Sequence, residues 1–305
     1  MRVTVGIPFL NARRTLPDAI RSVFAQTFED WELILLDDGS ADGSLEIARS
    51  VCDPRVRIVC DGMHKGLHSR LNEIAVLARG DYLARMDADD LMHPDRLARQ
   101  VQCLEADRRL DLIGTGVYVI DAQDNPVGIR DTGPLDTRPE SVLAGAILPH
   151  PTITGRTQWF RDNPYDERFP RAEDYELWRR TCSRSRFAKI TEPLYYLREG
   201  ARRPEDYIKD YLLTARSVRK ALRLYGPPTA GWPRTLRLLA SSRLKELAYR
   251  LATAAGMQDR LMRMRHGMPP SEAERESAVV GLAAVTSTRV PGMDAGLRPL
   301  EMGMR

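Results

Sequence analysis

The sequence predicts an α/β protein built on a doubly wound, mostly parallel sheet flanked by helices, with a basic helical extension at the carboxyl end. Three observations support this fold class. Short β-branched runs alternate with helical patterns over the first 105 residues, short turns connect them, and basic residues concentrate after residue 200. Strands that alternate with helices build parallel sheets with helices on both faces.

The first strand is predicted over residues 2–9, where apolar residues alternate and β-branched types are common. A helix is expected to begin after Thr15, because Pro17 follows it and Asp18 stands three residues on, close to a capping box. The apolar residues between 19 and 24 then fall at helical spacing.

Two more strand–helix pairs and a fourth strand follow. Residues 31–36 are an apolar strand, and residues 45–50 are a short helix after a glycine-containing turn. Residues 56–59 predict a third strand, Gly66 opens a longer helix, and an apolar run from residue 82 ends in a triplet of aspartates.

Three short motifs, two of them acidic, stand where three of these strands end. The segments are Pro8-Phe9, Asp37-Asp38 and Asp87-Ala88-Asp89. In open α/β sheets, ligands bind outside the carboxyl ends of the strands. Alternation along an extended backbone places Asp87 and Asp89 on one side, as a hard-oxygen site for Mg²⁺ or Mn²⁺ that can clamp a diphosphate. A solvated acidic loop is the alternative for one such segment, but three strand ends on one rim favour a ligand site.

These motifs together resemble the family-2 glycosyltransferases of GT-A fold. The likeness covers roughly the first 200 residues. The segments that carry it are residues 5–11, 36–44, 66–72, 80–90 and 93–97, with Ala172-Glu173-Asp174-Tyr175-Glu176-Leu177-Trp178 farther on. Each segment is a weak signal alone, and their order and spacing make a strong one.

The resemblance implies how a nucleotide-diphosphate sugar, with a UDP-sugar favoured, would be bound. Asp38 would hold the base or ribose, and Pro8 and Phe9 would line that pocket. Arg70 would lie near the base or the diphosphate. From local pattern alone, Asp38 could instead belong only to a turn, and Arg70 could be a solvated helix residue.

The resemblance also implies the reacting groups. Asp87 and Ala88 would contact the donor, and Asp89 would ligate Mn²⁺ or Mg²⁺, which neutralises the diphosphate leaving group as a Lewis acid. Asp174 would be the general base that deprotonates the acceptor hydroxyl, with Glu173 as the second choice. A base on the face opposite the leaving group inverts the anomeric centre. The local alternative for this acidic pair is a charged first turn of a helix.

The acceptor is the least determined partner. A glycan or a lipid-linked glycan precursor is expected from the resemblance. The chain departs from the family pattern at Thr154-Gly155-Arg156 and at Asn163-Pro164, in the region that shapes the acceptor pocket. His150 could orient the diphosphate or acceptor, but a buried structural histidine is at least as well supported, so it is left out of the catalytic set.

Composition agrees with a soluble globular enzyme. The 305 residues are 43% hydrophobic and 29% charged. The amino terminus does not read as a signal peptide, and no apolar run reaches the roughly 18 residues of a spanning helix. The four cysteines lack metal-ligand spacing and are expected to be reduced thiols in a cytoplasmic protein.

The last third of the chain is basic. From residue 201 onward there are 19 Lys or Arg against 10 Asp or Glu, although the whole chain carries a net charge of only +4. Leucines between residues 236 and 251 repeat at helical spacing among Arg237, Arg243, Lys245 and Arg250. The preferred interpretation is a helix packed on the catalytic domain through these leucines. The alternative is peripheral docking on an anionic membrane, on its inner face.

We therefore expect residues 1–105 to bind the nucleotide sugar and residues 106–200 to bind the acceptor within the same domain. Residues 201–265 would form the helical extension and residues 266–305 a weakly ordered tail.

The alternative function class is a non-catalytic or differently acting protein of this fold, such as a nucleotide-sugar-binding module or a sugar nucleotidyltransferase. A nicotinamide enzyme would need Gly-x-Gly-x-x-Gly after the first strand, which is absent. Nucleic-acid binding is not expected, because no recognition motif accompanies the basic residues.

Overall fold

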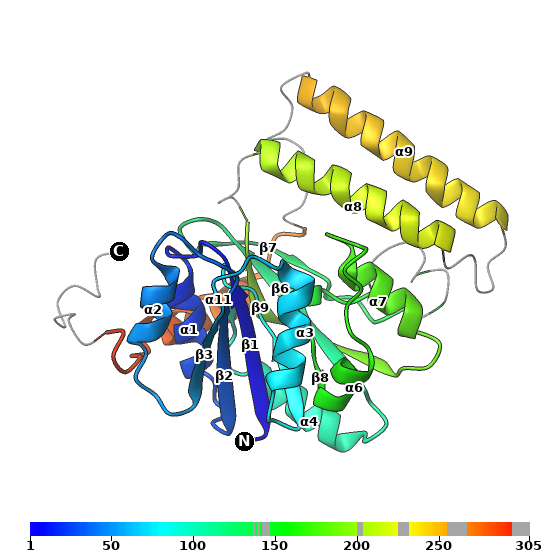
Figure 1. Cartoon of the computed structure of the whole chain (residues 1–305). Coiled ribbons are helices and arrows are strands. Elements are labelled where there is room, and N and C mark those ends of the chain that lie inside the picture. Colours follow the sequence, from blue (N-terminus) through cyan, green and yellow to red (C-terminus); the bar gives the residue numbers. More distant parts are fainter. Residues whose placement is uncertain are drawn as a thin grey trace.

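A computed structural model gives the fold, and it describes residues 1–136, 138, 141, 147–199, 204–224, 232–254 and 267–294. The centre is a sheet in the order β3-β2-β1-β4-β8-β6-β9-β5, with β7 paired to β6 (Figure 1). The strands are β1 (Val3–Phe9), β2 (Trp31–Asp37), β3 (Val56–Cys60), β4 (Tyr82–Arg85), β5 (Leu91–Met92), β6 (Leu112–Ile120), β7 (Pro126–Arg130), β8 (Thr154–Arg156) and β9 (Phe187–Arg198).

The first four strands are parallel neighbours, as predicted. Beyond them the sheet is mixed, because β8 is antiparallel to both β4 and β6 while β9 runs parallel to β6. The α/β class with helices on both faces of the sheet is therefore confirmed. The carboxyl ends of β1, β2 and β4 meet at one edge, which is the edge that carries the polar residues.

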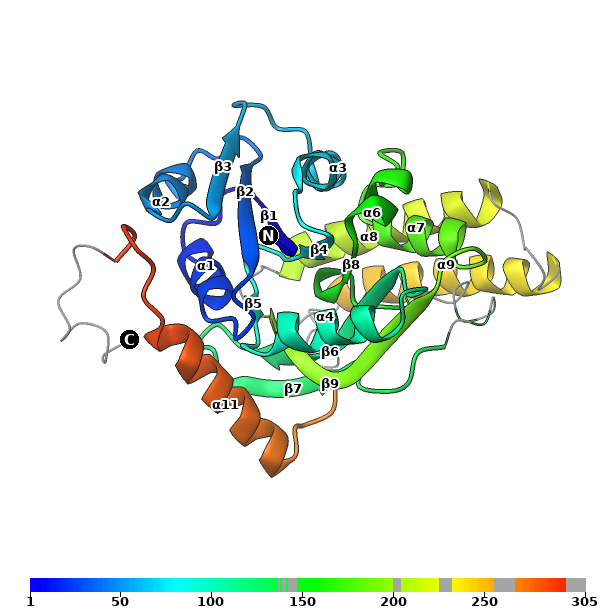
Figure 2. The ribbon, with the colours of Figure 1, turned by 90° about the horizontal axis from the view of Figure 1, so that it is seen from below.

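Helices cover both faces of the sheet (Figure 2). The helices of this part of the chain are α1 (Leu16–Phe24), α2 (Ser44–Ser50), α3 (Leu67–Leu77), α4 (Arg96–Ala106), α6 (Thr157–Asp162) and α7 (Glu173–Thr181). Apolar residues of α1, α2 and α4 pack with one face of β1 and β2 in the larger core. Residues of α3, α6 and α7 pack with the other face in a second core.

Local sequence explains where the helices near the site begin. Thr15 is the residue before α1, with a proline in the first turn, but no side-chain capping bond forms there. The capping box suggested by Asp18 is therefore wrong, because its carboxylate pairs with Arg21 at 2.9 Å instead. Gly66 precedes α3 with φ +88°, a left-handed value that L side chains rarely adopt. Its backbone N–H then points to Asp38.

The carboxyl-terminal segment differs from the weakly ordered tail that the sequence predicted from residue 266. Residues 272–287 form α11 (Glu272–Ser287), which begins with a capping box between Ser271 and Glu274. Ala278, Leu282 and Val285 of α11 are buried against residues of β5, β6 and β9. The segment continues to Asp294, which pairs with Arg21 of α1 at 2.5 Å. The composition of this segment did not predict a helix, because tertiary contacts rather than a strong apolar stripe stabilise α11.

Two long helices, α8 (Pro204–Leu224) and α9 (Trp232–Ala254), lie side by side next to the carboxyl edge of the sheet (Figure 1). The prediction that the repeating leucines of α9 are core residues is wrong. Leu236, Leu244, Leu247 and Leu251 are between 53% and 67% exposed. The helix instead contacts α8 through Tyr249, which stacks on Tyr211 at 3.9 Å between ring centroids. In the described part of the chain, every helix is too short or too polar to cross a bilayer.

Because α11 belongs to the fold, crowding its buried face should destabilise the whole domain. A Cβ atom added at Gly281 would meet the Tyr196 hydroxyl and, at 2.8 Å, the ring of His93. We expect Gly281→Val to cost about 1–3 kcal/mol of unfolding free energy, as overpacking does. Ala283→Val places the same side chain at an exposed position of the same helix and is the matched control. Equal thermal melting points for the two variants would contradict the packing of α11.

Candidate active site

The three predicted strand ends line two adjoining hollows at the carboxyl edge of the sheet. The first hollow, which we call the base-side hollow, is lined by Pro8, Phe9, Asp38 and Arg70. The second, the acidic hollow, is lined by Arg85, Asp87, Asp89, Asp90, Glu173 and Asp174 among others. Leu67, Arg171 and Glu173 line both, so the two hollows form one continuous surface. Except for Ala88, the residues predicted from the sequence are brought together here.

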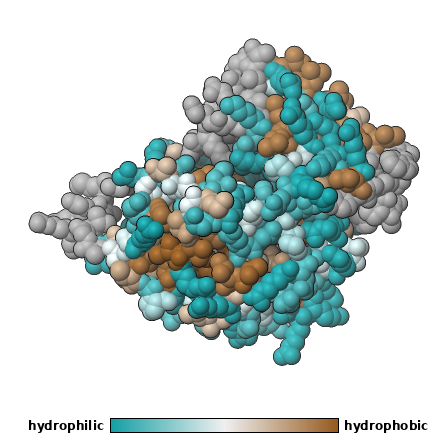
Figure 3. Space-filling model, viewed as in Figure 1, coloured by the Kyte–Doolittle hydropathy of each residue, from teal (hydrophilic) through white to brown (hydrophobic). Residues whose placement is uncertain are grey.

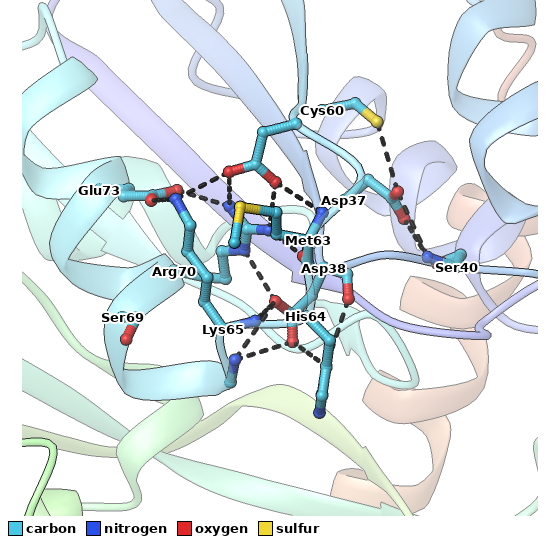
Figure 4. A network of polar contacts seen from close by, with 12 residues as sticks. Asp37, Asp38, Ser40, Cys60, Met63, His64, Lys65, Ser69, Arg70 and Glu73 are labelled. Carbon is cyan, nitrogen blue, oxygen red and sulfur yellow. Dashed lines mark hydrogen bonds and ion pairs between the residues drawn. The ribbon is translucent and has the colours of Figure 1, made fainter.

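Asp38 is the fixed anion of the base-side hollow (Figure 4). Its carboxylate accepts hydrogen bonds from Arg70 Nε at 2.8 Å and from the backbone N–H groups of Lys65 and Gly66. The Nδ1 atom of His64 lies 2.8 Å away. Burial alone would raise the pKa of Asp38, but these hydrogen bonds outweigh it and hold the pKa below its usual value. The hollow therefore presents an ionised carboxylate, which can only accept hydrogen bonds.

Arg70 holds Asp38 in place. Its side chain is 1% exposed, and it also pairs with Asp61 at 2.7 Å and Glu73 at 2.8 Å. Its remaining contact is the carbonyl of Met63. Hydrogen bonds to Asp61 and Asp38 raise the pKa of Arg70 further, so it stays charged. Because Nε and both terminal nitrogens of Arg70 are engaged, this geometry favours support of Asp38 over the help with base or diphosphate that the resemblance implied.

The aspartates after β4 lie in a turn. The strand ends at Arg85, and the backbone N–H of Asp90 donates to the carbonyl of Asp87 at 3.4 Å. The extended alternation that predicted the pairing of Asp87 and Asp89 is therefore wrong, although their carboxylates do come together. Asp90, which the sequence analysis omitted from the site, joins them, and the ligand atoms of all three lie within 4.8 Å of one another. Ala88 packs its side chain into the larger core, so only its backbone is available to a ligand.

This cluster suits a divalent cation. Burial and the charges of Asp89 and Asp87 raise the pKa of Asp90 well above its usual value. Asp90 is also oriented by the Tyr195 hydroxyl at 3.0 Å and by the backbone N–H of Arg198 at 2.8 Å. Three close carboxylates repel one another, and a hard cation with oxygen ligands relieves that repulsion. Asp87, Asp89 and Asp90 are thus the residues that would hold Mg²⁺ or Mn²⁺.

Arg85 is the functional candidate that the sequence analysis missed. Its side chain is 5% exposed and pairs with Asp87 at 2.7 Å. Its Nε and Nη1 groups are buried without a hydrogen-bond partner among the described residues. Buried donors are nearly always paired in native proteins, and these two belong to a side chain that lines the hollow, so they are available to an anionic ligand. The signal in the sequence was an arginine at the end of the otherwise apolar strand β4.

Glu173 and Asp174 form the first turn of α7, where the helix dipole favours acids. Burial, with the charge of Asp174 second, raises the pKa of Glu173 to about 7. Burial also raises the pKa of Asp174, whose carboxylate accepts from the N–H of Tyr175 at 2.7 Å. Raised carboxyl pKa values near neutrality are typical of general bases. Both side chains line the acidic hollow, so the geometry is compatible with either as the base.

His150 lines the same hollow and is bonded at 2.8 Å to the Tyr165 hydroxyl through Nε2. Burial and the nearby Arg85 charge lower its pKa well below the usual value. A neutral, hydrogen-bonded histidine fits the structural role that kept it outside the catalytic set.

Comparison with known proteins agrees with this geometry. Residues 4–168 match Glycosyl transferase family 2. The chain belongs to this family. It is 36% identical over 209 residues to EpsE of Bacillus subtilis (strain 168), which carries a glycosyltransferase name, and the match covers 66% of this chain and 74% of EpsE. The chain is therefore a glycosyltransferase that takes a sugar from a nucleotide sugar, as the resemblance predicted.

Another relative is the UDP-Glc:alpha-D-GlcNAc-diphosphoundecaprenol beta-1,3-glucosyltransferase WfgD of Escherichia coli. It is 27% identical over 177 residues, which cover 58% of this chain and 68% of WfgD.

Two solved structures share the fold. S. aureus TarS 1-349 in complex with UDP-GlcNAc has a TM-score of 0.56 at 16% identity, covering 97% of this chain and 83% of that one. The mannosyltransferase PcManGT from Pyrobaculum calidifontis, in complex with GDP-Man and Mn²⁺, has a TM-score of 0.56 at 17% identity, covering 93% and 85%. Both support the GT-A-like architecture.

The raised pKa of Glu173 predicts a pH dependence. A carboxyl group with a pKa of about 7 takes up a proton as the pH falls through 7, so the carboxylate form is lost on the acid side. We expect the release of nucleoside diphosphate from a nucleotide sugar, with water as acceptor, to fall below about pH 7. A bound cation would move this fall to lower pH, because it favours the carboxylate.

Two variants distinguish the role of Glu173 from that of its neighbour Asp174. Glu173→Gln mimics the protonated carboxyl, so it should keep the low turnover of the acid side at higher pH and remove the fall near pH 7. Asp174→Asn should instead reduce turnover by about 10²–10⁴ at every pH, the usual contribution of a positioned base, and leave that fall in place. Wild-type turnover in Asp174→Asn together with an inactive Glu173→Gln would assign the base to Glu173 instead.

Proposed function

We propose that this protein is an inverting transferase that moves a sugar from a UDP-sugar to a hydroxyl group of a glycan or lipid-linked glycan. The observation that carries the proposal is the continuity of the two hollows. An ionised Asp38 stands at one end, and an acidic cluster faces Glu173 and Asp174 at the other. A nucleoside, its diphosphate and the transferred sugar need recognition groups in this order.

The nucleoside would occupy the base-side hollow. Pro8 and Phe9 supply apolar surface, and the Asp38 carboxylate accepts hydrogen bonds from a base N–H or from ribose hydroxyls. Uracil and guanine both offer an N–H group, so this chemistry alone does not separate them. The UDP-sugars in the names of TarS and WfgD favour UDP, whereas PcManGT, which shares the fold, was solved in complex with GDP-Man.

The diphosphate would lie across the acidic hollow. Asp89, with Asp87 and Asp90, would hold Mn²⁺ or Mg²⁺, which neutralises the leaving group when bound. The unpaired Nε and Nη1 donors of Arg85 provide hydrogen bonds for anionic oxygens beside Asp87. Such preorganised donors stabilise charge that develops as the sugar leaves.

The acceptor hydroxyl would be deprotonated by Asp174, with Glu173 as its raised-pKa neighbour. A single base acting from the face opposite the diphosphate gives inversion, by the same geometry that governs inverting glycosidases. The acceptor would be bound by residues 106–200, where the chain departs from the family pattern. The four cysteines are free, which supports a cytoplasmic location with access to nucleotide sugars.

Donor binding should depend on a cation held by Asp89. Asp89→Asn keeps the size of the side chain and removes its charge. We expect the variant to lose transfer and to lose the Mn²⁺-dependent part of the thermal shift that a UDP-sugar produces, because ligand binding stabilises the folded state by mass action. Asp162→Asn, at an exposed position at the end of α6, is the matched control. Full transfer by Asp89→Asn, or by wild type in excess chelator, would contradict the metal assignment. Testing GDP- and dTDP-sugars alongside would identify the nucleobase of the donor.

A further inference from the structure

The helices α8 and α9 form a helix pair beside the active site. The inner face of α8 contributes Asp210, Tyr211 and Thr214 to the acidic hollow and Leu213 to the base-side hollow. Ala221 of α8 is fully buried in a small apolar cluster with Phe169, just before α7. The position of α8 is therefore coupled directly to the site.

On its other side, α8 holds α9 through polar and aromatic contacts. Arg219 pairs with Glu246 at 2.8 Å and donates to the Ser242 hydroxyl at 3.2 Å. Tyr211 stacks on Tyr249. These contacts use one face of α9, and at the described residues the leucines on the opposite face are exposed.

That uncovered face carries the leucine stripe, which we define as Leu236, Leu244, Leu247 and Leu251. Their spacing of eight, three and four residues keeps them on one side of a helix. All four are more than half exposed. In Figure 3, brown apolar residues are interspersed with teal ones over α8 and α9. A row of exposed leucines among basic residues on one helix is typical of a helix that lies at a membrane surface rather than of a fully solvated face.

Basic side chains border the stripe. Arg216, Arg219, Lys220 and Arg223 of α8 and Arg243 of α9 line one shallow hollow, which we call the basic groove. Where the side chains of the helix pair are described, at residues 209–224 and 236–251, there are nine basic and two acidic residues. The two acids, Asp210 and Glu246, are each paired with an arginine. The surface therefore has a strong positive charge beside exposed leucines.

We propose that the leucine stripe and the basic groove dock the enzyme on the surface of an anionic phospholipid bilayer. The leucines would enter the boundary between headgroups and acyl chains, and the arginines would contact lipid phosphates. This inference rests on the proposed function for its purpose, since docking next to the site would bring the two hollows to the level of a lipid-linked acceptor.

The charge of this surface selects a bilayer over other occupants. A second copy of the chain would bring like charges together, because the basic groove adjoins the stripe. A nucleic acid would be attracted to the arginines but would leave the leucines exposed to water.

Co-sedimentation with vesicles, without donor or acceptor, tests the proposal. We expect the full chain to bind vesicles of phosphatidylcholine mixed with phosphatidylglycerol roughly tenfold more tightly than phosphatidylcholine alone, because several basic residues contact anionic lipid. Binding should weaken as salt rises, since salt screens these charges. Equal binding to neutral and anionic vesicles, or no binding to either, would overturn the proposal.

Paired variants separate the apolar and charged contributions. Leu244→Gln with Leu247→Gln, and Arg216→Gln with Arg223→Gln, should each reduce vesicle binding by roughly tenfold or more. The matched controls are Val279→Gln with Val280→Gln on α11, which are 51% and 64% exposed, and Arg108→Gln with Arg109→Gln on a surface loop. All four double variants change exposed positions and should keep the wild-type melting point. Wild-type vesicle binding by the leucine variant would overturn the proposal, as would a concentration-dependent dimer that this variant abolishes.

The thermal shift produced by a UDP-sugar, measured on the same variants, distinguishes this proposal from the proposed function. Retained donor binding with no vesicle binding in wild type would refute docking alone. Vesicle binding with no donor binding would support docking and refute the proposed donor.

Discussion

Charges at the carboxyl edge of the sheet must be compensated, and two buried arginines there each hold one carboxylate. Arg70 of α3 neutralises Asp38 at the end of β2, and Arg85 at the end of β4 pairs with Asp87. A buried charge without a partner costs several kcal/mol, roughly, so Arg70 determines whether Asp38 can stay ionised in place. The order of β2, β1 and β4 in the sheet brings the two pairs to one edge, on either side of the end of β1.

The two arginines have different capacities for a ligand. Arg70 is engaged at Nε and both terminal nitrogens, which makes Asp38 a rigid acceptor. Arg85 pairs with Asp87, but its Nε and Nη1 donors are buried and have no hydrogen-bond partner among the described residues. The Asp38 side of the site therefore has its charges paired without a ligand. The Arg85 side would be completed by an anionic ligand and a cation together. This difference matches a donor whose nucleoside is uncharged and whose diphosphate is strongly charged.

The sequence predicted the features that depend on local pattern. Apolar runs located β1 to β4, and the residues at the ends of β1, β2 and β4 located the edge that carries both Asp38 and Asp89. It failed where proximity arises from turns and tertiary packing. Asp90 joins the site through a turn that breaks the strand alternation, and Arg85 joins it through the tertiary packing that buries its side chain at the end of β4. Helical periodicity identified the leucines of α9 as one face of a helix, but it carries no information on what covers that face. The order of α11 was missed because contacts with distant strands stabilise it.

The central claim is that Asp38 and the Asp89 cluster bind two parts of one ligand. NMR titrations of uridine and of UDP, with and without Mn²⁺, test it most directly in wild type, Asp38→Asn and Asp89→Asn. We expect Asp38→Asn to weaken the binding of both ligands. Asp89→Asn should weaken the binding of UDP alone, by roughly tenfold or about 1.4 kcal/mol, and only with Mn²⁺ present. Unchanged UDP affinity in Asp89→Asn, or unchanged uridine affinity in Asp38→Asn, would contradict it.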